Sequence, residues 1–395
     1  MDLTISQRAS RIKPSPTLTV SAKAAAMRAA GEDVISLAAG EPDFDTPEHV
    51  KEAAAKAMRE GFTKYTAVEG IPSLKKAIVD KFRRDNGLEY SPEQVLVSVG
   101  CKHSFYNLTH ALLNLGDEVL IPAPYWVSYP DMVLLAEGKP VVIETTMADQ
   151  FKLTPPQLAR AITRRTRLLV INSPCNPTGG SYTREDLRQL GQVLGEHPRV
   201  LIASDDIYEH IYWGEEPFVN ILDPCPELAA RTVVLNGVSK AYAMTGWRIG
   251  YAAGPVKLIE AMATLQSQST SNPVSIAQKA AQAALEGSQD LVREHCRIFR
   301  TRHDYVLARL QELPGVQCLP CAGTFYAFPD MRGAIARLDK IHSDIELAEF
   351  ILDKAKLALV PGSAFGTPGH LRLSFATSME TLERAMDRLA KTLSR

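Results

Sequence analysis

The sequence lacks the features that mark several classes of protein. Its 395 residues include only six cysteines, too few for the disulfide framework of a small secreted domain, and they fit a reducing compartment. No apolar run approaches the ~20 residues that span a bilayer. No apolar stretch follows a basic one near the start of the chain, as it would in a signal peptide. These absences predict a soluble, cytoplasmic protein.

An excess of charge of one sign is also lacking. Lysine and arginine number 44, and aspartate and glutamate 45, which gives a net charge of −1 at pH 7. Binding to a nucleic acid draws on counterions released by clustered basic residues, for which this balance offers no obvious source. The only CxxC pair, Cys318 and Cys321, has no second pair, so it indicates ordinary thiols and no metal site. Small molecules or proteins are therefore the expected ligands, with no nucleic acid and no membrane.

What the sequence does contain is an alternation of strands and helices. Runs of β-branched residues, separated by helical stretches, occur at 95–99, 118–121, 141–143, 167–171, 199–203 and 232–235. The alternation is typical of βαβ units and predicts an α/β fold with a mainly parallel sheet covered by helices on both faces. No GxGxxG follows a strand, which argues against a nicotinamide dinucleotide enzyme.

The pattern changes towards both ends of the chain. Prolines interrupt the first 45 residues and indicate an arm that lies over other parts of the molecule. A long helical stretch runs from about residue 280 to Leu310, and strands are expected after it at 316–319, 324–328, 358–360 and 371–375. We expect the arm and part of the small domain at 1–45, a large domain at 46–285, and a small α+β domain with the interdomain helix at 286–395.

The residues that follow the predicted strands carry the chemistry. Ligands of open parallel sheets bind beyond the carboxyl ends of the strands, where this chain has Cys101, Lys102, Trp126, Asn176, Asp205, Tyr208, Lys240 and Arg248. Taken singly, such residues are more often caps, turns or surface charges. Together they suit one ligand with a ring nitrogen, a phenolic oxygen, an aldehyde and a phosphate. That ligand is pyridoxal phosphate.

Three strings in this set resemble the motifs of class I aminotransferases, which are fold type I pyridoxal phosphate enzymes. They are Ser239-Lys240-Ala-Tyr-Ala-Met-Thr-Gly246-Trp-Arg248, Asn176-Pro-Thr-Gly179 and Ser204-Asp205-Asp206-Ile-Tyr208. The resemblance covers essentially the whole chain. It implies a seven-stranded-type sheet between helices, a homodimer with active sites shared across its interface, and a transaminase that uses pyridoxal phosphate.

The resemblance also implies roles for the cofactor residues. Lys240 would be the Schiff-base lysine and proton shuttle, and Asp205 would pair with the pyridine nitrogen. Asn176 and Tyr208 would bind the phenolic oxygen, and Trp126 would stack on the ring. The phosphate would be held by Arg248, by the turn at Cys101 and Lys102, and by Tyr65 reaching in from the second subunit.

A further set of residues is implied for the substrate. Arg372 of the small domain, assisted by Gly40 and Asn176, would clamp the α-carboxylate, and Trp126 would also contact the substrate. The planar guanidinium fork matches a carboxylate better than an ammonium does.

The distal carboxylate of a dicarboxylic substrate needs a second cation. Animal-type aspartate aminotransferases place an arginine where this chain has Ser267, so that arginine is missing. The bacterial branch that the chain most resembles replaces it by a lysine and a threonine, at the positions of Lys102 and Thr17.

These observations predict an aspartate:2-oxoglutarate aminotransferase of amino acid metabolism. Prephenate is a further candidate substrate, since some members of the bacterial branch accept it. A transaminase for alanine, aromatic amino acids or methionine, or a pyridoxal phosphate-dependent β-lyase, would have the same fold and stays open. A non-catalytic regulator is disfavoured because the chain shows no helix-turn-helix segment and keeps Lys240.

Overall fold

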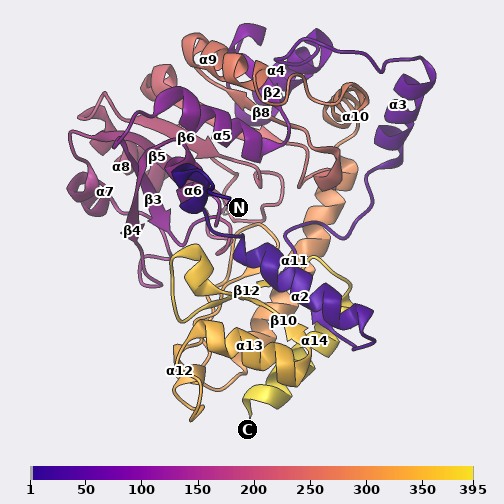
Figure 1. Cartoon of the computed structure of the whole chain (residues 1–395), viewed down its shortest axis with the longest axis vertical. Helices are drawn as coiled ribbons and strands as arrows, with labels where there is room; N and C mark the ends of the chain where they lie inside the picture. Colours follow the sequence, from indigo (N-terminus) through magenta and orange to yellow (C-terminus); the bar gives the residue numbers. More distant parts are fainter. Residues whose placement is uncertain (1–2, 395) are drawn as a thin grey trace.

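A seven-stranded sheet forms the centre of the larger lobe of the molecule (Figure 1). The structure, a computed structural model, describes residues 3–394. In spatial order the strands are β2 (Val95–Ser98), β8 (Gly250–Ala253), β7 (Thr232–Gly237), β6 (Leu201–Asp205), β5 (Thr166–Asn172), β3 (Glu118–Ala123) and β4 (Lys139–Glu144). Neighbouring strands run parallel except at β8, which is antiparallel to both β2 and β7. The predicted mainly parallel, seven-stranded sheet is confirmed.

Helices cover both faces of this sheet, as the βαβ pattern predicts. The core on one face involves α5 (Cys101–Leu112), α6 (Tyr129–Leu135) and α9 (Val256–Ser267). The core on the other face involves α4 (Pro72–Asn86), α7 (Pro155–Ala161), α8 (Arg184–Gly195) and α10 (Ser275–Glu286). Because both faces are buried, the central strands read as nearly continuous apolar runs.

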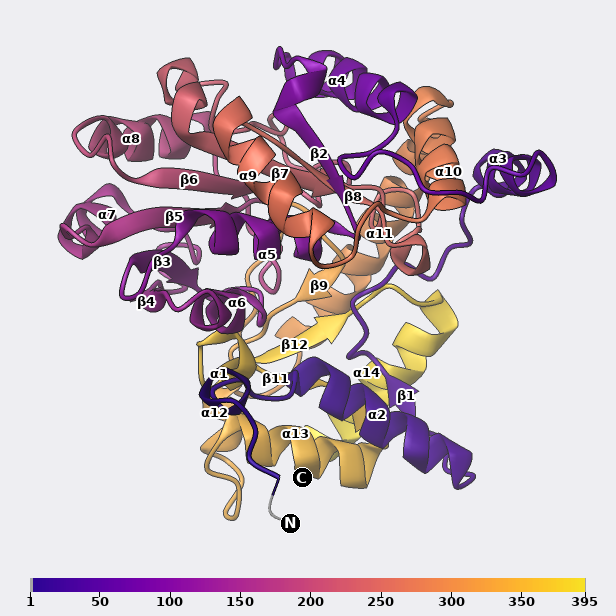
Figure 2. The same cartoon turned by 45° about the horizontal axis from the view of Figure 1, so that its top comes forward.

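The smaller lobe lies below the sheet in Figures 1 and 2. It contains an antiparallel sheet of β11 (Val360–Pro361), β12 (Leu371–Ser374) and β9 (Tyr326–Ala327), and a parallel pair of β1 (Ile35–Ser36) and β10 (Leu357–Ala358). Its helices are α12 (Arg332–Ile335), α13 (Asp344–Ala355) and α14 (Met379–Leu393). The long α11 (Asp290–Gln311) leads from the larger lobe into this one.

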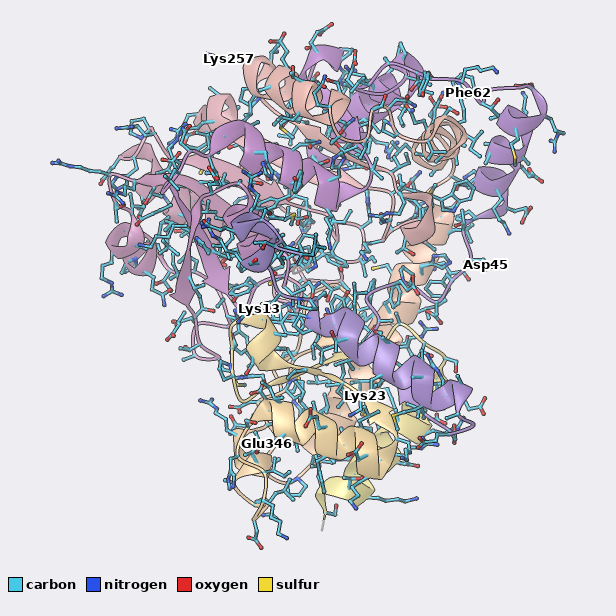
Figure 3. The ribbon with its side chains drawn as sticks, viewed as in Figure 1. Lys13, Lys23, Asp45, Phe62, Lys257 and Glu346 are labelled. Atoms are coloured by element: carbon cyan, nitrogen blue, oxygen red, sulfur yellow. The ribbon has the colours of Figure 1, made fainter. Side chains whose placement is uncertain are left out.

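The segment before α3 (Glu48–Arg59) is more regular than its prolines suggest. It forms α1 (Gln7–Ser10) and the 14-residue α2 (Pro16–Ala29), which packs beside the smaller lobe. Pro16 begins α2, where a missing N–H costs nothing and the fixed φ favours the helix. Lys13 and Lys23 of this segment, and Asp45 on the connection to the larger lobe, are labelled in Figure 3.

Two further expectations need correction, and one strand was not expected. The helical stretch from 280 to Leu310 is two helices, α10 and α11, separated around Gly287. The run 316–319 forms only an isolated bridge between Gln317 and Asp330. The strand β8 was not predicted, because Gly250-Tyr-Ala-Ala has no β-branched residue. No helix within residues 3–394 is long and apolar enough to cross a bilayer.

Candidate active site

The carboxyl ends of β5 and β6 meet at one edge of the sheet. Asn172, which ends β5, is paired with Asp205, which ends β6. The Asn172 side chain donates to the Asp205 carbonyl over 2.9 Å and accepts from the backbone N–H of Asn176, also over 2.9 Å. The loop that carries Asn176 is therefore fixed to the strand that carries Asp205.

Asp205 is buried and its carboxylate has three donors. The Tyr129 hydroxyl donates to Oδ2 over 2.5 Å, and the Ile207 N–H and the Cys101 thiol donate to Oδ1 over 3.3 and 3.8 Å. Burial raises the pKa of Asp205, while the Tyr129, Ile207 and Cys101 hydrogen bonds and the charge of Lys240 oppose that rise. Tyr129 was missed in the sequence; its only signal is its position three residues after Trp126, at the start of α6.

Lys240 follows β7 of the larger lobe and contacts Gly40, which follows β1 of the smaller lobe. Its ammonium donates to the carbonyl of Gly40 over 2.6 Å and makes no ion pair within residues 3–394. Burial, followed by the positive charges of Arg248 and Arg372, lowers the pKa of Lys240 to about 8. The amine is therefore much more often neutral at physiological pH than a surface lysine.

Two tyrosines lie close to Lys240. Tyr208 is buried, and its ring centroid is 6.0 Å from the Lys240 amine. The hydroxyls of Tyr208 and Tyr326 are hydrogen-bonded over 3.1 Å. Tyr326 also limits the space at Gly40, because a Cβ added there would lie 2.7 Å from the Tyr326 hydroxyl. Tyr326 is a second site residue that the sequence reasoning missed.

Arg372 of β12 is a buried cation without a carboxylate. It is 2% exposed, donates to Asn176 Oδ1 over 3.0 Å and to the Ala38 carbonyl over 2.7 Å, and pairs with no acidic residue within 3–394. Its guanidinium packs 4.4 Å from the ring centroid of Tyr326 and 4.9 Å from that of Phe365. Its buried Nε has no partner. A buried charge is costly unless an anion compensates it, so this arrangement suits a carboxylate ligand.

A second anion site lies at the start of α5. The backbone N–H groups of Cys101 and Lys102 open this helix and donate to no acceptor within the described residues. Gly100 has φ +81°, and a Cβ there would lie 2.4 Å from Nη2 of Arg248. The free amides, the positive end of the helix dipole and the guanidinium together favour a phosphate.

Three other candidate residues, Lys102, Thr17 and Tyr65, make fewer contacts with the site residues described above. The Lys102 ammonium lies 5.0 Å from the ring centroid of Trp126 and meets no carboxylate in residues 3–394. Desolvation and the charge of Arg248 lower the pKa of Lys102. Thr17 has a buried hydroxyl without a partner. Tyr65 is 92% exposed, and one chain by itself does not bring it into the site.

The family model for aminotransferase class I and II matches residues 32–389, nearly the whole chain. The chain belongs to this family. This aminotransferase is 57% identical over 395 residues to an aspartate/prephenate aminotransferase of Nitrosomonas europaea, with 99% of this chain and 100% of the relative covered.

Solved structures of relatives have the same architecture. The aspartate aminotransferase from Rhizobium meliloti gives a TM-score of 0.96 at 47% identity, covering 100% of both chains. The aspartate aminotransferase from Thermus thermophilus with maleate gives 0.93 at 44% identity, covering 99% of this aminotransferase and 100% of that chain. The fold type I architecture and the membership inferred from the motifs are confirmed.

Proposed function

We propose that this aminotransferase transfers the amino group of aspartate to 2-oxoglutarate and uses pyridoxal phosphate as cofactor. The observation that carries the proposal is the buried guanidinium of Arg372, which meets no carboxylate within residues 3–394 and lowers the pKa of Lys240. A binding group for an α-carboxylate thus lies beside a reactive amine. The names of the relatives from Nitrosomonas europaea and Thermus thermophilus support the same substrate.

The residues fit pyridoxal phosphate at three points. The amides at the start of α5 and Arg248 suit its phosphate, and Asp205 at the end of β6 suits its ring nitrogen. Lys240, with its lowered pKa, suits its aldehyde. When bound, the cofactor supplies an aldehyde that takes up an amine and a ring that accepts negative charge.

Four residues would hold the ring of the cofactor. Burial raises the pKa of Asp205, and a protonated ring nitrogen beside it would favour the ionised carboxylate, which would in turn keep the proton on that nitrogen. Tyr208 and Asn176 would bind the phenolic oxygen, and Trp126 would stack on the ring. These contacts would fix the ring in one orientation.

The substrate contacts complete the mechanism. Arg372 binds the α-carboxylate with help from Asn176 and the backbone at Gly40, which fixes the Cα–H bond relative to Lys240. Lys240, as a neutral amine, would take the Cα proton on Nζ and pass it to the cofactor, and in the second half-reaction it would bring a proton back to Cα of the new amino acid. Because Arg372 is buried, the carboxylate that it binds would be largely shielded from water.

Selectivity for dicarboxylic substrates is assigned to Lys102, with Thr17 in a supporting role. Lys102 is a cation beside Trp126 without an acidic partner in the described chain, and Ser267 supplies no charge. Maleate, bound in the Thermus thermophilus relative, is a dicarboxylate. Prephenate also carries two carboxylates, so we include it as a second substrate of the same site.

The proposal extends to assembly and domain organisation. Tyr65 is almost fully exposed and would reach the phosphate of a second subunit in a homodimer with shared active sites. We assign residues 46–285 to the cofactor domain and residues 286–395, together with part of 1–45, to the small domain. The cytoplasm is the proposed location.

The test is a comparison of kcat/KM for four amino acids with 2-oxoglutarate as acceptor. Aspartate should exceed alanine, phenylalanine and methionine by at least about hundredfold, because only aspartate carries a second carboxylate for the Lys102 cation. Prephenate should accept the amino group in a parallel assay. Equal values for the four amino acids, or ammonia release in place of amino acid product, would favour another transaminase or a β-lyase.

A further inference from the structure

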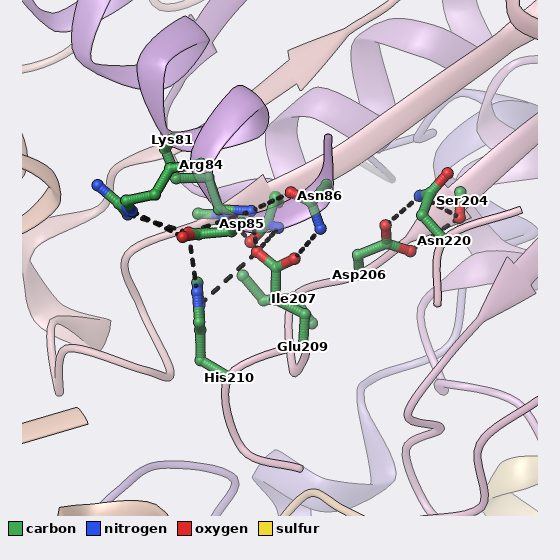
Figure 4. Close-up of polar contacts among 12 residues, drawn as sticks. Lys81, Arg84, Asp85, Asn86, Ser204, Asp206, Ile207, Glu209, His210 and Asn220 are labelled. Carbon is green, nitrogen blue, oxygen red and sulfur yellow. Dashed lines mark hydrogen bonds and ion pairs between the residues drawn. The ribbon is translucent and has the colours of Figure 1, made fainter. Parts of the chain in front are cut away.

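A fully buried ion pair lies outside the groups that contact cofactor and substrate. Lys81 on α4 is 0% exposed and pairs with Glu209, which is also buried (Figure 4). Glu209 is the residue after Tyr208 in the chain. The Lys81 amine also donates to the side chain of Asn86 at the end of α4, over 2.7 Å.

Glu209 joins three separate parts of the chain. Asn86 donates to one carboxylate oxygen over 2.7 Å, and Asn236 of β7 donates to the other over 2.7 Å. Lys81 shares this second oxygen. His210 links the cluster to Asp85, with 3.1 Å between Nε2 and the carboxylate. The segment after β6, the end of α4 and the end of β7 therefore meet at one carboxylate.

Two of these segments carry the reacting groups. Asp205 and Tyr208 lie on the same short segment as Glu209. Asn236 lies four residues before Lys240, and its side chain also accepts from the N–H of Gly237 over 2.7 Å. A displacement of Glu209 would move Asp205 and Tyr208 relative to Lys240.

Asp206, the residue after Asp205, is a second buried carboxylate in this segment, and its side chain has different partners from that of Glu209. Its Oδ1 accepts from Ser204 over 2.8 Å and its other oxygen accepts from Asn220 (Figure 4). Neither partner belongs to α4 or β7. The side-chain link from this segment to α4 and to Asn236 of β7 thus passes through Glu209 and not through Asp206.

Stability alone does not account for a buried ion pair. Such a pair loses hydration on both charges, and apolar side chains of similar size are often as stabilising. The hydrogen bonds of the pair, in contrast, depend on direction. The Glu209 carboxylate has all of its hydrogen-bond partners only in the position where Lys81, Asn86 and Asn236 all contact it. We propose that the Lys81–Glu209 pair positions the Asp205–Tyr208 segment relative to Lys240, an inference that rests on the proposed transaminase function.

The experiment compares Glu209→Gln, Lys81→Met and the double variant with the wild type. The matched control is Lys76→Met/Asp80→Asn, which removes an exposed ion pair from the same helix, α4. For the single variants we expect kcat with aspartate to fall about ten- to hundredfold. KM should change less than about twofold, since Arg372 has no bond to this cluster. The control should behave as the wild type.

The double variant separates positioning from folding. It leaves neither Lys81 nor Glu209 as an unpaired buried charge, so its thermal unfolding should return towards that of the wild type. Its kcat, and the visible circular dichroism that reports the orientation of bound pyridoxal phosphate, should stay reduced. A double variant with wild-type kcat and circular dichroism would overturn the proposal, as would single variants that lose only thermal stability.

A measurement on the apoprotein tests the positioning role of the Lys81–Glu209 pair independently of the proposed reaction. Amide hydrogen exchange over residues 205–210 and 236–240 should become faster in Glu209→Gln and in the double variant, but not in the α4 control. Unchanged exchange would overturn the positioning role even if aspartate is the substrate. Faster exchange in a protein that fails to transaminate aspartate would leave the positioning role standing and remove only the proposed function.

Discussion

The hydroxyl of Tyr129 donates a hydrogen bond of 2.5 Å to Oδ2 of Asp205, from a helix that begins 76 residues earlier in the chain. Burial alone would raise the pKa of this carboxyl and favour its neutral form. Tyr129, together with Ile207 and Cys101, stabilises the ionised form. The charge state of Asp205 thus depends on three donors that come from different elements.

Removing either member of this pair should reduce transamination without unfolding the protein. Asp205→Asn should lower the single-turnover rate with aspartate by several orders of magnitude, because an amide cannot keep the ring nitrogen protonated. Tyr129→Phe should lower it about tenfold, the scale of one hydrogen bond to a charged group. Asp206→Asn is the control, since Asp206 bonds to Ser204 and Asn220 instead. If the control were the most damaging change, the assignment of Asp205 would be wrong.

Lys240 should react as an amine at a lower pH than free lysine. Its pKa is lowered to about 8, against about 10.4 for an unperturbed lysine. The rate at which apoprotein combines with pyridoxal phosphate, followed by absorbance, should therefore rise with pH to a midpoint near 8. Borohydride should then leave the reduced adduct on Lys240, and an adduct on another lysine would contradict this assignment.

The same shift determines how Lys240 contributes to stability. Between about pH 8 and pH 10.4 the residue is deprotonated in the folded chain and protonated in the unfolded chain, so unfolding takes up a proton. The free energy of unfolding of the apoprotein should rise with pH across this window. Urea denaturation of Lys240→Met apoprotein should lack that component. Identical pH profiles for the two proteins would show that the pKa is not lowered.

One added methyl group near the start of α5 should weaken the proposed phosphate site. A Cβ at Gly250 would lie 2.1 Å from the backbone nitrogen of Cys101, so Gly250→Ala must displace the start of α5. We expect the affinity for pyridoxal phosphate, measured by equilibrium dialysis, to fall at least about tenfold. Gly246→Ala is the matched control in the same segment, because a Cβ there would meet nothing within 4 Å. Equal affinity in both variants would place the phosphate elsewhere.

Arg372→Ala should weaken all amino acid substrates alike, because each carries the α-carboxylate. The expected loss in kcat/KM is about 30-fold or more, on the scale of a buried charge pair. Arg372→Lys should restore only part of it, since an ammonium cannot donate as a planar fork. A loss confined to aspartate and glutamate would show that Arg372 reads the side chain of the substrate.

Lys102→Ala should instead act selectively. We expect kcat/KM for aspartate and glutamate to fall about 30-fold or more, with alanine and phenylalanine little affected. Thr17→Val should show a weaker effect of the same kind. Because Lys102 also opens α5, cofactor affinity is measured in parallel. An equal loss for all four amino acids with weaker cofactor binding would assign Lys102 to the phosphate alone.

Much of this site could be predicted from the chain in isolation. Runs of β-branched residues locate six of the seven strands of the large sheet, because β-branched side chains favour strands and because the central strands, buried on both faces, are nearly continuously apolar. Parallel strands bring their carboxyl ends to one edge, so the residues after β5 and β6 converge whatever the details of packing. The placement of Asn176 and Asp205 follows from that rule.

Only the tertiary structure decided which groups surround those residues. The carbonyl that accepts from Lys240 lies 200 residues away at Gly40, and the carbonyl bound by Arg372 lies 334 residues away at Ala38. The place of Tyr326 in the site and the partners of Glu209 could likewise not be predicted from the sequence. Local patterns report which face of a strand or helix is buried, whereas the pairing of polar groups inside the protein depends on how distant segments pack, because each buried donor or charge is stable only beside its partner.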